Sequence, residues 1–164
     1  MSAYDNLHIV YRVFAPFNRV QPAAIFVKKF EWLESFELRV PEIDGDHRAM
    51  LDLMKAVRAS ASAGNRERVE HYLDRLFALT QNHFAREETL LLRWGYPDAK
   101  MHANYHQRLL ERAKEVRRAC AQIESAEAFE ACCDEMMTFL VDDVVRGDMK
   151  MKSFLESNGL TLPA

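Results

Sequence analysis

Four consecutive segments with helical periodicity, separated by three short breaks, most strongly constrain how this chain can fold. The breaks are Gly64-Asn65, Gly95-Tyr96-Pro97 and Glu124-Ser125, and their glycine, proline and polar residues interrupt a sequence that otherwise favours helices. Each segment carries apolar residues at alternating steps of four and three, which is the pattern of a helix that buries one face. Four such helices with short connections predict an all-α, up-down-up-down antiparallel four-helix bundle.

The composition supports this fold class and excludes several partners. The chain has 164 residues, enough for one domain with a sizeable core, and a net charge of -3, which gives no electrostatic basis for binding nucleic acid. It has no run of 18 apolar residues that would cross a membrane and no recognisable signal peptide, so we expect a cytoplasmic protein. Cys120, Cys132 and Cys133 have no metal-ligand spacing and are interpreted as reduced thiols packed in the core.

Histidines and carboxylates replace apolar residues near the same end of all four helical segments. In the second and third segments they come in pairs four residues apart, so each pair projects from one helical face. With alternating helix direction, all of these groups converge at one end of the bundle, and buried imidazoles with carboxylates are what a transition-metal site requires. The candidate ligands are His47, His83, Glu87, His102, His106, Asp143 and Asp148. The simpler interpretation, ordinary polar residues on helices, suits His8 and His71.

The stretch FLVDDVVRGD at residues 139–148 places three aspartates in an apolar segment. Asp142 lies off the apolar stripe and is expected to face water. Residues five apart on an ideal helix point about 140° away from each other, so Asp143 and Asp148 reach one metal pair only if the helix is distorted or ends there. Gly147 is a candidate for such a distortion, and equally for a simple helix end.

The residues resemble a known family, the bacterial hemerythrins. The resemblance rests on WLESFELRVPEIDGDHRAML, HFAREE, GYPDAKMHANYHQRLL and FLVDDVVRGD. In order, they match the family's successive motifs H, HxxxE, HxxxH and HxxxxD, except that Asp143 stands where the last motif has its histidine. The similarity extends from about Phe30 to Leu155. It implies a four-helix bundle with a non-haem di-iron centre that binds O2 reversibly at one of its two irons.

The resemblance also implies a role for each candidate ligand. Glu87 and Asp148 would bridge both irons, together with an oxo or hydroxo group. The histidine pairs would be His47 with His83, at the iron with an open position, and His102 with His106, at the second iron. The family's third histidine on the second iron falls at position 143, where this chain has Asp143.

The aspartate at position 143 has three expected consequences. The iron that takes O2 keeps its full ligand set, so binding of a small diatomic molecule is not abolished. If Asp143 binds the second iron, its negative charge would favour Fe(III) and speed autoxidation. Together with His102 and His106, it would also form the two-histidine, one-carboxylate set of many iron oxygenases. Alternatively, its side chain is too short to reach, which would leave water or an open site on the second iron.

An apolar pocket next to the ligands would admit O2 and exclude water and anions. The residues expected to line it, each about one helical turn from a ligand, are Leu51, Phe84, Phe139, Leu140 and Val144. The simpler interpretation is that these residues belong to the ordinary core.

We expect an N-terminal arm at residues 1–29, a hemerythrin-like bundle at 30–157 and a C-terminal tail at 158–164. The arm would pack over the bundle or contact a partner protein. Three classes of function are open: a di-iron protein that binds O2 for transport, storage, delivery or sensing; a di-iron oxidase or peroxidase; and a regulatory module with a partly degenerate or non-iron metal site. The sequence does not determine the oligomeric state.

Overall fold

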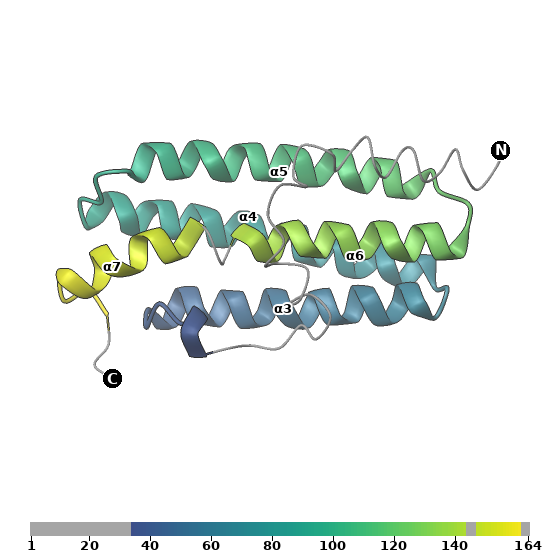
Figure 1. The fold of residues 1–164 in the computed structure, drawn as a ribbon, viewed down its shortest axis with the longest axis horizontal. Helices are drawn as coiled ribbons and strands as arrows, with labels where there is room; N and C mark the ends of the chain where they lie inside the picture. Colours follow the sequence, from purple (N-terminus) through teal and green to yellow (C-terminus); the bar gives the residue numbers. More distant parts are fainter. Residues whose placement is uncertain (1–33, 144–146, 162–164) are drawn as a thin grey trace.

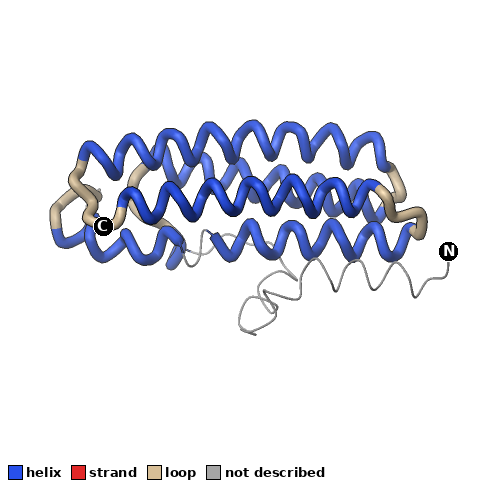
Figure 2. The backbone as a smooth tube through the Cα atoms, turned by 90° about the horizontal axis from the view of Figure 1, so that it is seen from above, coloured by secondary structure: helices blue, strands red, loops and turns tan. Residues whose placement is uncertain are grey.

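The structure, a computed structural model, describes residues 34–143 and 147–161, with the backbone alone for residues 35, 138–140, 142 and 143. The expected arm at 1–29 and Val144 therefore lie outside the described residues. The elements are a short 3₁₀ helix η2 (Glu34–Phe36) and the α-helices α3 (Pro41–Ser62), α4 (Arg66–Arg93), α5 (Ala99–Ala121), α6 (Ala126–Asp143) and α7 (Met149–Ser157). The described residues form no strand (Figure 2), which confirms the all-α fold class.

Helices α3 to α6 run side by side in alternating directions (Figure 1). Each of these four helices packs against two neighbours, in the order α3, α4, α5, α6 and back to α3. The register of α3 against α4 follows from two layers of contacts, His47 with His83 and, one turn further into the bundle, Met50 with Thr80. The predicted antiparallel four-helix bundle is therefore confirmed.

The breaks between the helices fall where the sequence predicts them. Gly64 and Gly95 have positive φ angles of 67° and 70°, a left-handed conformation that glycine adopts without the steric cost of a side chain. The side chain of Asn65 accepts a hydrogen bond from the backbone N–H of Arg68 at 3.0 Å and so caps the start of α4. The glycines thus end α3 and α4, and the Asn65 cap starts α4 after the first turn.

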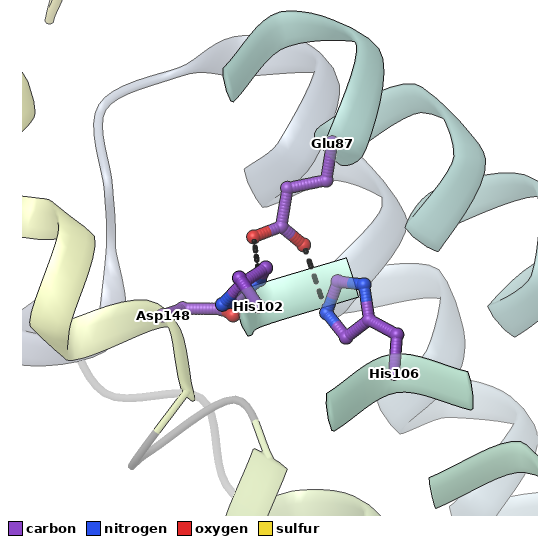
Figure 3. A group of neighbouring side chains, drawn as sticks. All are labelled: Glu87, His102, His106 and Asp148. Atoms are coloured by element: carbon purple, nitrogen blue, oxygen red, sulfur yellow. Dashed lines mark hydrogen bonds and ion pairs between the residues drawn. The ribbon is translucent and has the colours of Figure 1, made fainter. Parts of the chain in front are cut away.

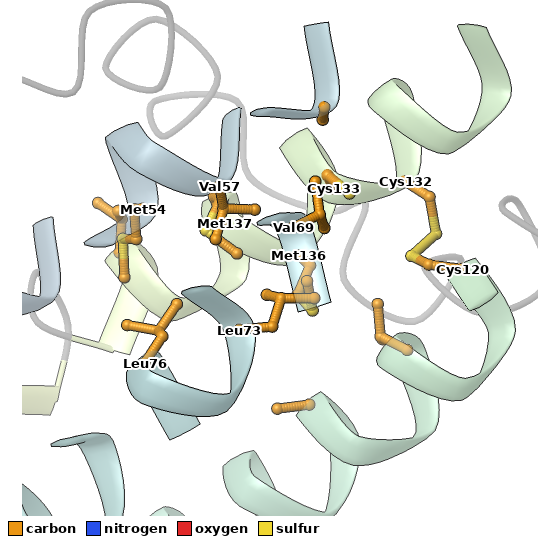
Figure 4. Close-up of a cluster of buried hydrophobic side chains, with 14 of the residues drawn as sticks. Met54, Val57, Val69, Leu73, Leu76, Cys120, Cys132, Cys133, Met136 and Met137 are labelled. Atoms are coloured by element: carbon orange, nitrogen blue, oxygen red, sulfur yellow. A yellow bond between two sulfur atoms is a disulfide. The ribbon is translucent and has the colours of Figure 1, made fainter. Parts of the chain in front are cut away.

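The apolar stripes of the four helices form the main core. Val57, Leu76, Ala113 and Met136, one from each helix, have 0% of their surface exposed. Figure 4 shows part of this cluster, which fills the interior of the bundle and reaches the histidine layer at Phe84. Burial of these stripes, rather than helix propensity alone, holds the bundle together.

Helix α7 was not predicted by the helical stripes. It lies at one end of the bundle (Figure 1), where a second apolar cluster anchors it. The buried members of this cluster are Leu38, Val40, Ile43, Leu91, Ala99, Met151 and Leu155. Gly147 and Asp148 form a π-helical turn that leads into α7, so the chain is distorted at Gly147 and does not simply stop there. None of the described helices combines the length and the apolar composition that a membrane span needs.

The prediction of three reduced cysteines is wrong for two of them. Cys120, near the end of α5, and Cys132, in α6, form a disulfide with a Cα–Cα distance of 5.7 Å, and Cys133 is a free buried thiol (Figure 4). The two residues are 12 positions apart along the chain. The turn between α5 and α6 brings them together, and spacing along the sequence alone does not reveal such a pair.

Candidate metal centre

Six of the seven predicted ligands meet inside the bundle, at the end where α7 lies. His47 comes from α3, His83 and Glu87 from α4, His102 and His106 from α5, and Asp148 from the turn before α7. All six are buried. The side chain of Asp143, the seventh, lies outside the described residues. As metal ligands, all seven remain predictions.

The first group of ligand atoms comes from His47, His83 and Asp148, all within 4.8 Å of one another. The Nε2 atoms of His47 and His83 are 3.2 Å apart, and Nε2 of His47 lies 2.9 Å from Oδ2 of Asp148. Two nitrogens bound side by side to one metal at about 2.1 Å are roughly 3.0 Å apart. The two imidazoles are therefore spaced as a shared metal requires.

The second group comes from Glu87, His102, His106 and Asp148, also within 4.8 Å of one another (Figure 3). Oε1 of Glu87 lies 2.8 Å from Nε2 of His102, and Oε2 lies 3.7 Å from Nε2 of His106. Oε2 is also 3.3 Å from Nε2 of His83, which belongs to the first group. Asp148 is common to both groups and Glu87 contacts histidines of both, so the two carboxylates lie between two metal-binding positions.

The buried polar atoms of this cluster fit a bound cation. Oε2 of Glu87 and Nε2 of His106 face each other beyond hydrogen-bond distance, and neither has a hydrogen-bond partner among the described residues. Such buried groups are costly unless something pairs with them. Neutral imidazole nitrogens with carboxylate oxygens are the donor set that iron and similar transition metals bind. A metal ion between these atoms would satisfy both of them.

Two carboxylates outside this cluster lie next to its histidines. Nδ1 of His106 donates a hydrogen bond to Oε1 of Glu88 at 3.0 Å. Asp46 places Oδ2 3.5 Å from Nδ1 of His83 and also pairs with Arg86. The hydrogen bond to Glu88 selects the tautomer of His106 that leaves Nε2 available to a metal. Nδ1 of His83 makes no hydrogen bond among the described residues. The sequence interpretation missed Asp46 and Glu88; the available signal was an acidic residue directly beside a predicted ligand.

Only two of the five predicted pocket residues have described side chains. Leu51 is buried in the main core. Phe84 is also buried and stacks on His106, with ring centroids 3.7 Å apart and an interplanar angle of 5°. The side chains of Phe139 and Leu140 and the whole of Val144 lie outside the described residues. As lining residues of an O2 pocket, all five remain predictions.

The charges of the cluster depend on one another. Burial favours the neutral form of His106 and lowers its pKa to about 3. Burial would also lower the pKa of His102, but the hydrogen bond to Glu87 outweighs it and raises the pKa. Burial, followed by the charge of Glu87, raises the pKa of Asp148 well above its usual value. The negative charge of Glu87 thus favours protonation of both His102 and Asp148.

Metal uptake is expected to release protons, because metal ligands must be deprotonated. With the pKa of His102 raised above 6.5, the protonated fraction grows as the pH falls, so proton release should increase and apparent affinity should decrease from about pH 8 to pH 6. Titration of the apoprotein with ferrous iron in weakly buffered indicator solution measures this release. His102→Gln should reduce it, whereas the matched change at exposed His71, His71→Gln, should not. If no protons are released when iron binds, or if proton release increases with pH, the assignment of His102 as a ligand that loses a proton would be contradicted.

The fold and the site define a four-helix bundle with two adjoining groups of metal-ligand residues. The chain matches the family model "Hemerythrin HHE cation binding domain" over residues 39–155 and belongs to this family. It is 27% identical over 120 residues to the bacteriohemerythrin of Stenotrophomonas maltophilia, covering 71% of this chain and 74% of the relative. It is 31% identical over 75 residues to the bacteriohemerythrin of Methylococcus capsulatus, covering 46% of this chain and 57% of the relative. No solved structure matches the chain significantly.

Proposed function

We propose that this protein carries a non-haem di-iron centre and binds O2 or a related diatomic molecule for transport, storage, delivery or sensing. The observation that carries the proposal is the pair of buried ligand groups that share Asp148 and are linked by Glu87. Two adjoining positions with common carboxylates suit a binuclear centre better than one isolated ion. Membership of the hemerythrin family and the two relatives named bacteriohemerythrin support iron as the metal.

Each ligand has a place in this proposal. Glu87 and Asp148 would bridge the two irons together with an oxo or hydroxo group. The histidines would divide as the geometry groups them, His47 with His83 at one iron and His102 with His106 at the other. When bound, the iron pair supplies the electrons and the open coordination position that O2 requires.

From the family's motif order we infer that the open position would lie at the iron held by His47 and His83. The additional ligand in that order falls at position 143 and would belong to the other iron, so the first iron would have one fewer protein ligand. The carboxylate of Glu88 accepts a hydrogen bond from His106 and holds its ring in orientation, and the carboxylate of Asp46 lies next to His83. The buried ring of Phe84, which stacks on His106, would help to exclude water from the ligands.

Mixing the reduced, iron-loaded protein with O2 tests this function. We expect a visible absorption band that forms with O2, persists, and disappears under vacuum, because a carrier returns its ligand unchanged. The apoprotein treated in the same way should show no band. Absence of any O2-dependent change in a protein that holds its full complement of iron would contradict binding of O2.

A di-iron oxidase or peroxidase is the second candidate function, and Asp143 is the observation that favours it. An additional carboxylate on the second iron would stabilise Fe(III) and complete a two-histidine, one-carboxylate set. In the same experiment, this function predicts immediate and irreversible conversion to the oxidised form, with turnover of added hydrogen peroxide. Asp143→His should then slow the conversion, and an unchanged rate would show that Asp143 is not a ligand.

A further inference from the structure

Three cysteines lie together in the bundle, away from the metal ligands. Cys120 and Cys132 are paired across the α5–α6 turn, and Cys133 follows directly on α6 (Figure 4). His102 and His106 stand near the start of α5, whereas Cys120 stands near its end. The sulfur cluster and the metal centre are therefore separated by most of the length of one helix.

We propose that Cys120 and Cys132 form a reversible two-electron redox site that hydrogen peroxide oxidises. The two residues occupy the core stripes of adjacent helices, and their Cα atoms are 5.7 Å apart, within the range that a disulfide requires. A reduced cysteine packs as a small apolar residue. Both oxidation states are therefore compatible with the same helix packing.

Burial determines which oxidant reaches the pair. Cys120 and Cys132 have 2% and 1% of their surfaces exposed. A protein oxidant or a bulky disulfide cannot contact such sulfurs while the bundle is closed, whereas hydrogen peroxide is nearly as small as water. Cys120 lies at the end of α5 and Cys132 in the second turn of α6, on either side of a short turn, where local opening can admit such a molecule.

The reaction balances with peroxide as the only oxidant. One cysteine sulfur, as the thiolate, attacks an oxygen of hydrogen peroxide, which breaks the O–O bond, gives a sulfenic acid and releases one water after protonation. The second sulfur attacks the sulfenic sulfur, which forms the S–S bond and releases a second water. Two thiols thus lose two electrons and two protons, and one peroxide becomes two waters. A small dithiol reverses the process by exchange.

Cys133 is excluded from this chemistry. It is fully buried, and it lies on a different face of α6 from its neighbour Cys132, because consecutive residues of a helix are about 100° apart. Burial, with the nearby charge of Asp134, raises the pKa of Cys133 to about 12, and Cys133 takes no part in the disulfide. Cys133 therefore provides an internal control on the same helix.

The disulfide links α5 to α6 covalently and should therefore stabilise the bundle. Helix α5 carries His102 and His106, and α6 continues toward Asp148. Cross-linking residues 12 positions apart restricts the unfolded chain. The oxidised apoprotein should therefore melt roughly 6–12 °C above the reduced one.

The test uses the full-length apoprotein, so that oxidation at iron does not contribute. The protein is reduced, freed of reductant without air, treated with one equivalent of hydrogen peroxide, and alkylated in denaturant for peptide mapping. We expect one remaining thiol, at Cys133, and a peptide that links Cys120 to Cys132. Cys133→Ser should form the same link and leave no thiol, whereas Cys120→Ser should form no link and show no change in Tm with peroxide.

Reversal and selectivity decide the outcome. Dithiothreitol added to the native oxidised protein should restore three thiols and the lower Tm. Three thiols remaining after peroxide, a link that includes Cys133, a sulfinic acid in place of the disulfide, or a bond that the dithiol cannot open in the folded protein would each overturn the proposal. These measurements do not depend on iron, so their failure leaves the proposed di-iron function standing.

Discussion

Replacing Glu87 by glutamine is expected to lower the affinity for iron at both positions by at least about tenfold, because this carboxylate contacts histidines of both groups. Glutamine keeps nearly the same volume but removes the negative charge that balances the cations. Metal analysis after reconstitution with ferrous iron measures the effect. Circular dichroism of the same samples shows whether the bundle is folded.

The matched control is Glu67→Gln, the same chemical change on the same helix. Glu67 is exposed in the first turn of α4, several turns from the predicted ligands His83 and Glu87, so this variant should bind as much iron as the unchanged protein. A Glu87→Gln protein that is folded and still binds its full iron would contradict the assignment of Glu87 as a bridging ligand.

Replacing Leu76 by alanine should lower the free energy of unfolding by about 2.7–5 kcal/mol, the range observed when a buried leucine is removed from a core. Leu76 is fully buried in α4, one turn from the layer that Met50 and Thr80 form. The cavity left behind loses packing contacts with the facing helices. Urea denaturation of the apoprotein under reducing conditions measures the change without contributions from metal or disulfide.

Leu92→Ala provides the comparison, because Leu92 is 70% exposed near the end of the same helix. Its loss should change the free energy of unfolding by less than about 0.5 kcal/mol. Equal effects at Leu76 and Leu92 would contradict the packing of α4 described above.

The bundle was predictable because its determinants are local. Periodic apolar stripes identify each helix, and Gly64 and Gly95 occupy turn positions that glycine prefers. Short connections then force neighbouring helices to be antiparallel. Helix α7 was not predicted, because its position depends on contacts of Met151 and Leu155 with residues far away in the sequence.

The clustering of the ligand residues was also predictable, because it follows from helix geometry. A spacing of four places His83 with Glu87 on one face, and the alternating helix directions bring these faces to one end of the bundle. The division of the ligands between two irons came from the family resemblance.

Contacts between side chains of different helices could not be predicted from the periodicity of apolar residues. The disulfide between Cys120 and Cys132 depends on the rotation of α6 against α5, which a stripe of apolar residues does not specify. The hydrogen bond between His106 and Glu88 likewise depends on the distance between α4 and α5.

The iron content of the purified protein tests the central claim most directly. Protein produced in iron-replete medium, or reconstituted anaerobically, is analysed for iron, zinc and manganese against the chain concentration. The two adjoining ligand groups predict about two irons per chain. A reproducible content of one iron or none, or full occupancy by another metal after reconstitution, would contradict the proposed di-iron centre.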